Sequence, residues 1–174
     1  MAEELTHLSA VELAHLVRTR RLSPVELTEA HLAALARVNP AINAFCTVVP
    51  DKALAWARQA EAAVKKRGKL GPLHGVPVGI KDLTVTADIR TTFGSTLFRD
   101  HVPTEDAEVV LRIKAAGAII LGKTNTPEFG AGANTVNKVF GATRNPWNTA
   151  LSASGSTGGG IADPRRSQGS LISR

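Results

Sequence analysis

The stretch of this 174-residue chain with the most potential for chemistry is the run SASGSTGGG, which ends at Gly160. Its hydroxyl side chains alternate with small residues and lead into three glycines. A backbone rich in glycine and hydroxyl groups can approach a ligand closely and can adopt strained dihedral angles, as a reactive loop requires. The same composition is typical of a flexible linker. Composition alone therefore leaves both interpretations open.

A second candidate is Lys81, near the end of the segment 71–83, GPLHGVPVGIKDL. Apolar residues alternate along this segment, so a strand would place them on one face and Lys81 on the other. Gly79 lies two residues earlier, and its missing side chain would leave room beside Lys81 on that face. A lysine at a strand end is most often a solvated charge. If it is buried instead, its pKa falls and the amine can act as a base.

The segments before the glycine run have signals of helices and strands. Predicted helices span 9–21, 23–38, 51–67 and 105–116, and predicted strands lie within 41–49, 71–83 and 118–121. Ser9 and Ser23 are N-caps, each with a glutamate three residues later as in a capping box. Asp51 and Thr104 are the expected N-caps of the other two helices, and Gly117 ends the last of them. The final strand is wholly apolar, which predicts an α/β sheet covered by helices.

The octapeptide GAIILGKT at 117–124 satisfies the P-loop pattern G-x-x-x-x-G-K-[ST] letter for letter. A P-loop needs a strand before its first glycine, a flexible loop between the glycines and a helix after the lysine. Here a helix is predicted before Gly117, and the residues between the two glycines are themselves the strand. The required context is absent, and we expect no nucleotide site.

Composition narrows the class of protein. An apolar content of 43% is enough for a globular core. The net charge is +6, but the sequence has no basic patch interleaved with aromatic residues and contains no tyrosine. Nucleic-acid binding is therefore not expected. The single cysteine, Cys46, excludes an internal disulfide and a cysteine-based zinc site. The N-terminus lacks the features of a signal peptide and no apolar run has membrane-spanning length, which predicts a soluble cytoplasmic protein without membrane partners.

Four segments taken together resemble the amidase signature family. They are GPLHGVPVGIKD at 71–82, AGAIILGKTNTPEFGAGANT at 116–135, FGATRNPWN at 140–148 and GSTGGG at 155–160. The resemblance is ordered along the chain from about Leu5 to Gly160. It implies an α/β fold with an amidase-signature-like mixed sheet covered by helices. It also implies hydrolysis of the carbon–nitrogen bond of a small-molecule amide by a Ser, cis-Ser, Lys triad, without a metal or cofactor.

The resemblance assigns roles to particular residues. Lys81, in GIKD, matches the general base of the family, and Ser156, in GSTGG, matches the bridging serine that a cis peptide bond holds. A cis bond before a residue other than proline costs about 3 to 4 kcal/mol, and Gly155 removes the side-chain clash on one flank. The residues that match the loop at the acyl pocket are Phe129, Gly130, Ala131 and Gly132. Ser154 and Thr157 depart only mildly from the family pattern GGSSGG.

The pattern of the family ends at Gly160. The acylating serine of the family lies in a later glycine-rich stretch, but IADPRRSQGSLISR follows here. Ser170 comes too early and lacks the paired glycines whose amides would form an oxyanion hole. We therefore expect residues 1–160 to be the N-terminal part of an amidase domain, incomplete at its C-terminus. Residues 161–174 are expected to be an atypical, disordered tail, as a shifted reading frame would leave.

Two functions in different classes remain. The first is an amidase-family hydrolase truncated before its nucleophile, with Lys81 and Ser156 as its catalytic elements. The second is a catalytically inactive fragment, or an interaction module that binds through an unpaired sheet edge. The sequence does not choose the amide substrate or the oligomeric state.

Overall fold

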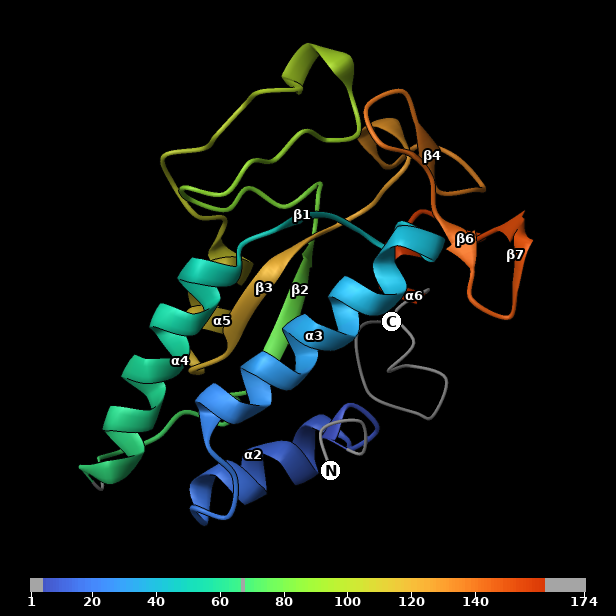
Figure 1. The fold of residues 1–174 in the computed structure, drawn as a ribbon. Helices are drawn as coiled ribbons and strands as arrows, with labels where there is room; N and C mark the ends of the chain where they lie inside the picture. Colours follow the sequence, from blue (N-terminus) through green and yellow to red (C-terminus); the bar gives the residue numbers. More distant parts are fainter. Residues whose placement is uncertain (1–4, 67, 162–174) are drawn as a thin grey trace.

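The computed structural model describes residues 5–66 and 68–161, and its centre is a mixed three-stranded sheet (Figure 1). The strands are β1 (Phe45–Val48), β2 (Pro77–Lys81) and β3 (Ile119–Thr124), in the order β1-β3-β2. β3 pairs antiparallel with β1 and parallel with β2. The predicted mixed α/β sheet is confirmed, and Pro77 opens an edge strand, where a missing N–H is tolerated.

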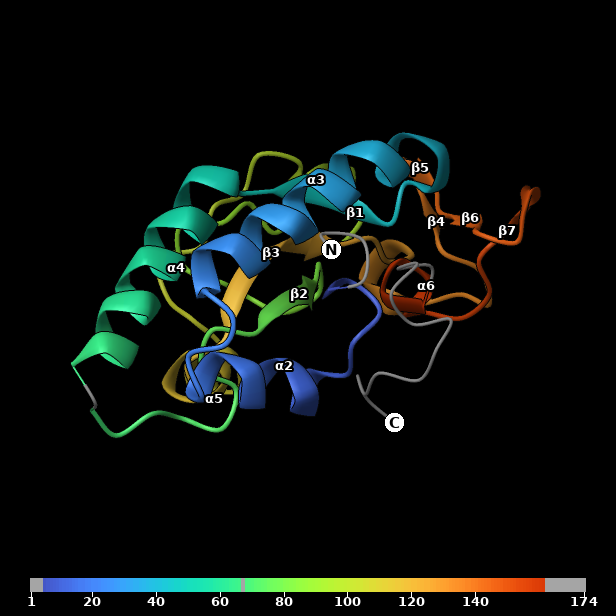
Figure 2. The same cartoon turned by 60° about the horizontal axis from the view of Figure 1, so that its bottom comes forward.

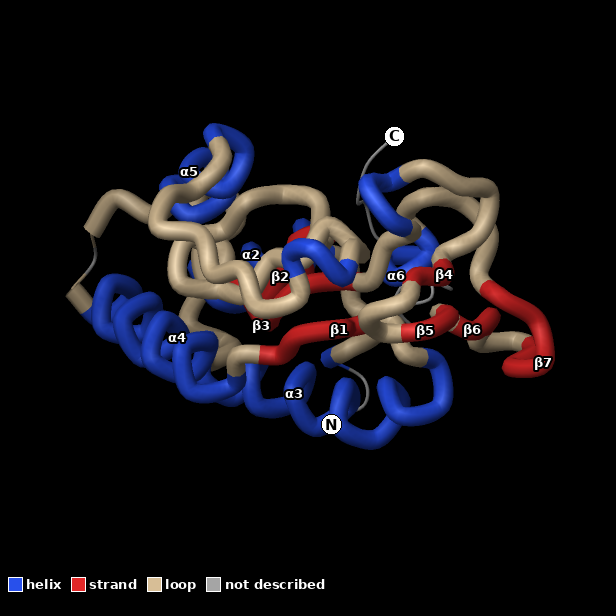
Figure 3. Tube along the Cα trace, turned by 90° about the horizontal axis from the view of Figure 1, so that it is seen from above, coloured by secondary structure: helices blue, strands red, loops and turns tan. Residues whose placement is uncertain are grey.

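Helices cover both faces of this sheet. They are α2 (Ala10–Arg18), α3 (Pro24–Ile42), α4 (Pro50–Lys65), α5 (Glu108–Ala115) and the short α6 (Gly158–Ile161). Figures 2 and 3 show α3 and α4 together on one side of the sheet and α5 on the other. α2 packs against α3 through a buried cluster that contains Val17 and Leu27. The described helices include none that is both long and apolar enough to cross a membrane.

The first three residues of β3 are all apolar because they pack into hydrophobic clusters on both faces of the sheet. Ile119 and Leu121 belong to the cluster under α3 and α4, whereas Ile120 packs with Val110 of α5. Successive strand residues point to opposite faces. The strand is therefore buried on both sides, and all six of its residues are buried, as the apolar run predicts.

The helix boundaries follow the sequence only in part. Ser9 forms the full capping box with Glu12, as predicted. The predicted end of α3, at residue 38, is wrong, because the helix continues through Pro40 to Ile42. Asn43 closes the last turn in a left-handed conformation, with its N–H donating to Asn39 O at 2.7 Å. This closure satisfies the helix end although Pro40 lacks an N–H.

Two predicted N-caps are also wrong. The N-cap of α4 is Val49 rather than Asp51, and the N-cap of α5 is Ala107 rather than Thr104; neither makes a side-chain capping bond. The chain before α5 is bound to the preceding loop instead, since Ala107 N donates to Val85 O at 3.0 Å. A competing tertiary contact therefore delays the start of the helix.

The end of α5 agrees with the prediction. Gly117 has φ +86°, and the N–H groups of Gly117 and Ala118 donate to Lys114 O and Ile113 O. This is the Schellman arrangement, in which glycine takes the left-handed position after the helix.

After β3 the chain forms small structures beside one end of the sheet (Figure 1). They are the turn η2 (Glu128–Gly130), the pair β4 (Val136–Asn137) and β5 (Gly141–Ala142), and the hairpin of β6 (Arg144–Asn145) and β7 (Asn148–Ser152). A further turn, η1 (Thr96–Phe98), lies in the long connection from β2 to α5. After these segments, the glycine-rich run that ends at Gly160 lies beside the carboxyl end of β2.

Candidate active site

Lys81 lies at the carboxyl end of β2 with its side chain half-buried. Its Nζ donates hydrogen bonds to Ser156 Oγ at 3.3 Å and to Thr157 Oγ1 at 3.2 Å. Burial lowers the pKa of the Lys81 amine from its usual 10.5, because the charged form loses solvation. The structure thus brings together the two residues that the sequence analysis selected as catalytic.

The space beside Gly79 is not empty, contrary to the sequence expectation. A Cβ atom on Gly79 would lie 2.8 Å from Phe45 Cζ and 2.9 Å from Thr124 Cγ2. The glycine leaves room for the side chains of Thr124, on the adjacent strand β3, and Phe45, on β1 beyond it, to pack over this face of the sheet. Lys81 therefore leaves the sheet beside a filled surface, and its amine is directed to the serine loop.

Threonines in the segment after β3 hold the loop that carries Ser156. Thr135 Oγ1 donates to Gly155 O at 2.8 Å and accepts from Gly158 N at 2.8 Å. Thr126 Oγ1 donates to Ser156 O at 3.4 Å. Backbone groups on both sides of Ser156 are thus fixed by side chains 20 to 30 residues earlier in the chain. The loop is not a free linker.

Close packing explains the glycines after Thr157. A Cβ atom on Gly158 would overlap Thr135 Oγ1, and one on Gly159 would lie 2.5 Å from Asn125 N. Neither position can hold a Cβ atom, so only glycine allows the loop to approach the segment after β3. The glycine-rich composition reflects backbone approach, which the linker interpretation does not require.

The peptide bond before Ser156 is trans, because the described residues contain no cis peptide bond. The cis arrangement expected from the family resemblance is therefore not present in this structure. A cis bond without proline persists only where the surrounding residues impose it. At Gly155, which has φ +82°, a Cβ atom would meet nothing within 4 Å, so this side of the loop is open.

The loop 129–132 lies near the same end of β2 but does not bond to the lysine–serine pair in the described part of the chain. Phe129 is 54% exposed, has φ +50°, and donates its N–H to Phe93 O at 2.7 Å. Gly130 packs against Leu83, two residues beyond the lysine. The last two residues of the loop, Ala131 and Gly132, are exposed. Its predicted place at an acyl pocket stays a prediction.

Behind the site, β3 contributes a second lysine that is fully buried. Lys123 Nζ donates to Thr84 O at 2.5 Å, Thr86 Oγ1 at 3.1 Å and Thr91 Oγ1 at 2.8 Å. Burial lowers the pKa of Lys123 to about 8, and the nearby carboxylate of Asp82 acts in the opposite direction. Lys123 lies inside a strand, which agrees with the rejection of the P-loop.

Asp82 fixes the chain immediately after Lys81. Its carboxylate accepts from Thr92 N at 3.1 Å and from Thr92 Oγ1 at 2.5 Å, and its N–H donates to Thr124 O at 2.9 Å. Burial raises the pKa of this carboxyl group, and the bonds from Thr92 oppose the rise. The residue next to the candidate base is therefore held by both the sheet and the following loop.

Sequence reasoning missed most of these supporting residues. Thr157 appeared only as a mild departure from a family pattern, although its hydroxyl group contacts Lys81 as closely as Ser156 does. Lys123 entered only as part of a rejected motif. The sequence did contain a signal for its role, because a lysine inside an otherwise apolar buried strand needs hydrogen-bond partners. Ser170 lies outside the described residues.

The arrangement can move a proton between an amine and a serine hydroxyl group. A half-buried lysine with a lowered pKa and two hydroxyl partners is a suitable acceptor of that proton. Within residues 5–66 and 68–161, no three His, Cys, Asp or Glu side chains gather as a possible metal site.

Comparison with known proteins gives consistent matches. The Amidase family profile matches residues 26–162. A glutamyl-tRNA(Gln) amidotransferase subunit from Acidothermus cellulolyticus is 45% identical over 159 residues, which cover 91% of this chain and 32% of that protein. The corresponding subunit from Methylococcus capsulatus is 46% identical over 151 residues, 87% of this chain and 31% of the relative.

Solved structures agree with this result. A fatty acid amide hydrolase matches with a TM-score of 0.87 at 28% identity, over 92% of this chain and 28% of that one. A bacterial aryl acylamidase of the amidase signature family matches with a TM-score of 0.85 at 31% identity, over 90% and 33%. The chain thus spans about a third of the length of the relatives it matches. The profile match and these similarities show that the chain belongs to the amidase family.

Proposed function

We propose that this chain supplies the proton-transfer half of an amidase centre, which hydrolyses the carbon–nitrogen bond of a small-molecule amide. The single observation that carries the proposal is the contact of Lys81 Nζ with Ser156 Oγ at 3.3 Å. Family membership supports the reaction class, and the lowered pKa of Lys81 supports its role as the base.

In the proposed reaction Lys81 acts in its neutral form. A nucleophilic hydroxyl group gives its proton to Ser156 Oγ as it attacks the amide carbonyl, and Ser156 passes its own proton to Lys81 Nζ. The lysine then returns a proton, through Ser156, to the departing amine, which leaves the acyl group as an ester on the nucleophile. Water then attacks this ester by the same proton path, releases the carboxylic acid and restores the nucleophilic hydroxyl group. Thr157 Oγ1 holds the lysine amine from a second side at 3.2 Å. Positioned proton transfer of this kind contributes about 10² to 10⁴-fold in rate. The steps need no cofactor.

In this scheme neither hydroxyl group that contacts Lys81 in the described residues is assigned as the nucleophile. Ser156 is the relay in this scheme, and the hydroxyl group of Thr157 is bound to the same amine. We therefore propose that the acylating serine belongs to the portion that the longer relatives have beyond the matched third. Alone, this chain is expected to hydrolyse amides very slowly or not at all.

A chimera tests the proposal. Residues 1–160 would replace the matched third of the bacterial aryl acylamidase, which retains 31% identity to this chain, and hydrolysis of an aryl acylamide would be measured. We expect turnover that falls at least about 100-fold with Lys81→Ala. Exposed Lys69→Ala is the matched control and should keep the rate. A chimera whose rate is unaffected by Lys81→Ala would refute the role of the lysine.

A non-catalytic binding role is the second candidate, favoured by exposed apolar side chains on β4 and the β6–β7 hairpin. Val136, Trp147 and Leu151 are 52%, 78% and 56% exposed. Such residues are suited to packing against another polypeptide. If the 174-residue chain binds the separately produced remainder of the acylamidase, and the complex has no Lys81-dependent hydrolysis, the binding role is the better description.

A further inference from the structure

A pocket of about 320 Å³ lies away from the candidate active site, between α4, α5 and the start of β3. It includes Ile120, which is four residues before Thr124, the strand partner of Lys81. Four residues of strand separate the two places by about 13 Å. The volume is at the lower end of the range for small-molecule sites, about 300 to 1,000 Å³. Neither Lys81 nor Ser156 lines it.

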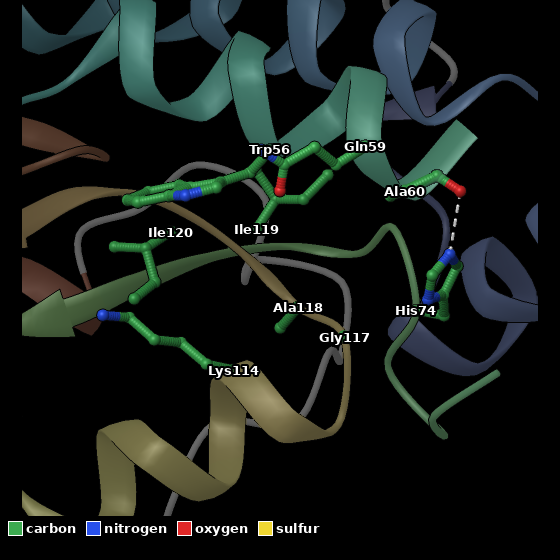
Figure 4. Close-up of a pocket in the computed structure, with 9 residues that line it drawn as sticks. All are labelled: Trp56, Gln59, Ala60, His74, Lys114, Gly117, Ala118, Ile119 and Ile120. Carbon is green, nitrogen blue, oxygen red and sulfur yellow. Dashed lines mark hydrogen bonds between the residues drawn. The ribbon is translucent and has the colours of Figure 1, made fainter. Parts of the chain in front are cut away.

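The walls of the pocket combine one aromatic surface with small and aliphatic residues. Figure 4 shows Trp56 and Gln59 reaching from α4 towards the strand, and Lys114 lying on the opposite side from α5. Ala118 and Ile120 form the base between them. The indole of Trp56, which also packs against the cluster that contains Ile120, therefore supplies the aromatic surface of the pocket. An aromatic ligand gains a stacked or edge-to-face contact with this indole that a saturated ring does not.

The charges at the pocket are balanced. Lys114 Nζ contacts Asp106 Oδ2 at 2.5 Å and lies 6.0 Å from the centroid of the Trp56 ring. An anionic ligand would have to compete with this carboxylate, and a cationic ligand would face the ammonium group. Both arrangements cost electrostatic energy in a partly desolvated site. A neutral ligand avoids both costs.

The polar groups that face the pocket indicate that its ligand carries an amide group. His74 contacts Ala60 O through Nε2 at 3.0 Å, so Nε2 carries the hydrogen of that bond (Figure 4). Gln59 is exposed, and its amide has no hydrogen bond to the described residues. A side-chain amide offers one acceptor and a pair of donor hydrogens. A primary carboxamide matches both in a pair of hydrogen bonds.

We propose that this pocket is a binding site for a small, neutral, aromatic carboxamide. The ring lies against Trp56 and the base of the pocket, and the amide pairs with the side chain of Gln59. The site is separate from the lysine–serine pair and does not depend on the proposed hydrolysis.

The test uses the 174-residue chain labelled with ¹⁵N and benzamide as the probe. We expect the indole signal of Trp56 and the side-chain amide of Gln59 to shift saturably, with a dissociation constant on the order of 1 mM or tighter for so small a ligand. Trp147, the other tryptophan, is 78% exposed on the β6–β7 hairpin, and its signal should not move. A Trp147→Phe variant assigns the two indole signals.

Matched ligands and variants decide the outcome. Three ligands of nearly the same size as benzamide each change one property: benzoate is negatively charged, benzylamine is positively charged, and cyclohexanecarboxamide has a saturated ring. Each should bind at least about 10-fold more weakly than benzamide. Gln59→Leu removes the amide from an exposed helix position and should weaken benzamide about 5- to 10-fold. Ala118→Leu, which fills the base, should abolish the shifts while circular dichroism stays unchanged.

The location is tested separately. Lys81→Ala should leave the binding of benzamide unchanged, because the lysine is remote from the pocket. Loss of binding in that variant, or equal binding of benzoate and benzamide, would overturn the proposal. So would an unchanged affinity in Gln59→Leu, even where Ala118→Leu fails to fold.

Discussion

Replacing Lys123 by methionine should change how the stability of the protein depends on pH. Methionine keeps much of the length of the side chain but removes the charge. Lys123 is fully buried and donates to three oxygens of the loop 84–91. Its burial lowers the pKa from 10.5 to about 8. The folded protein therefore releases this proton at a lower pH than the unfolded chain does.

The sign follows from proton binding. Below pH 8 the amine of Lys123 is protonated in both states, and its stabilisation does not vary with pH. Between pH 8 and 10.5 the unfolded chain binds more protons at this position than the folded protein does. The free energy of unfolding must then rise with pH across that window. The gap in pKa corresponds to a rise of about 3 kcal/mol, which is an upper bound.

Urea unfolding followed by circular dichroism between pH 7 and 10.5 measures the effect. The difference in unfolding free energy between the wild type and Lys123→Met should grow by about 2 to 3 kcal/mol over this range. At pH 7 the variant should be less stable by about 1 to 3 kcal/mol, because the oxygens of the loop lose their donor. Lys69→Met, at an exposed position, controls for the loss of one positive charge. Parallel pH profiles for the wild type and Lys123→Met would refute the reasoning.

Three further predictions concern the serine loop and the cysteine. In the acylamidase chimera, Ser156→Ala should lower kcat about 10² to 10⁴-fold, and an unchanged kcat would argue against a relay. Thr135→Val should destabilise the chain by about 1 to 3 kcal/mol in urea unfolding, because the bonds to Gly155 O and Gly158 N are both lost; a smaller effect would mean that the loop is held elsewhere. Burial raises the pKa of the Cys46 thiol. Cys46 should therefore react with a disulfide reagent much more slowly in the folded chain than in urea, and equal rates would contradict the raised pKa of this half-buried thiol.

The sequence predicts best what depends on neighbouring residues. The capping box at Ser9 and the Schellman end at Gly117 each need only hydrogen bonds within a few residues, and both are present. The burial of β3 follows from its apolar run in the same way. Lys81 could be placed at a strand end because the apolar residues before it alternate.

Contacts between residues far apart in the sequence determine the features that local patterns do not predict. Thr135 reaches a loop 20 residues later, and no local pattern marks a threonine for that task. The start of α5 is delayed by the bond of Ala107 to the loop at Val85, which capping rules do not include. The partners of Lys123 come from a connection 32 to 39 residues earlier in the chain. These positions are decided only when the loops fold back on the sheet.

The β6–β7 hairpin offers a practical consequence for engineering. The chain leaves the core at Thr143 and returns at Ala153, where Ala153 N donates to Thr143 O at 2.8 Å. Everything between these residues is an excursion with a closed base and an exposed tip at Trp147. Lengthening such an excursion costs only about 0.6 kcal/mol for each doubling of its length. A peptide tag or fluorophore site inserted after Trp147 would therefore label the protein without displacing Ser156 from Lys81.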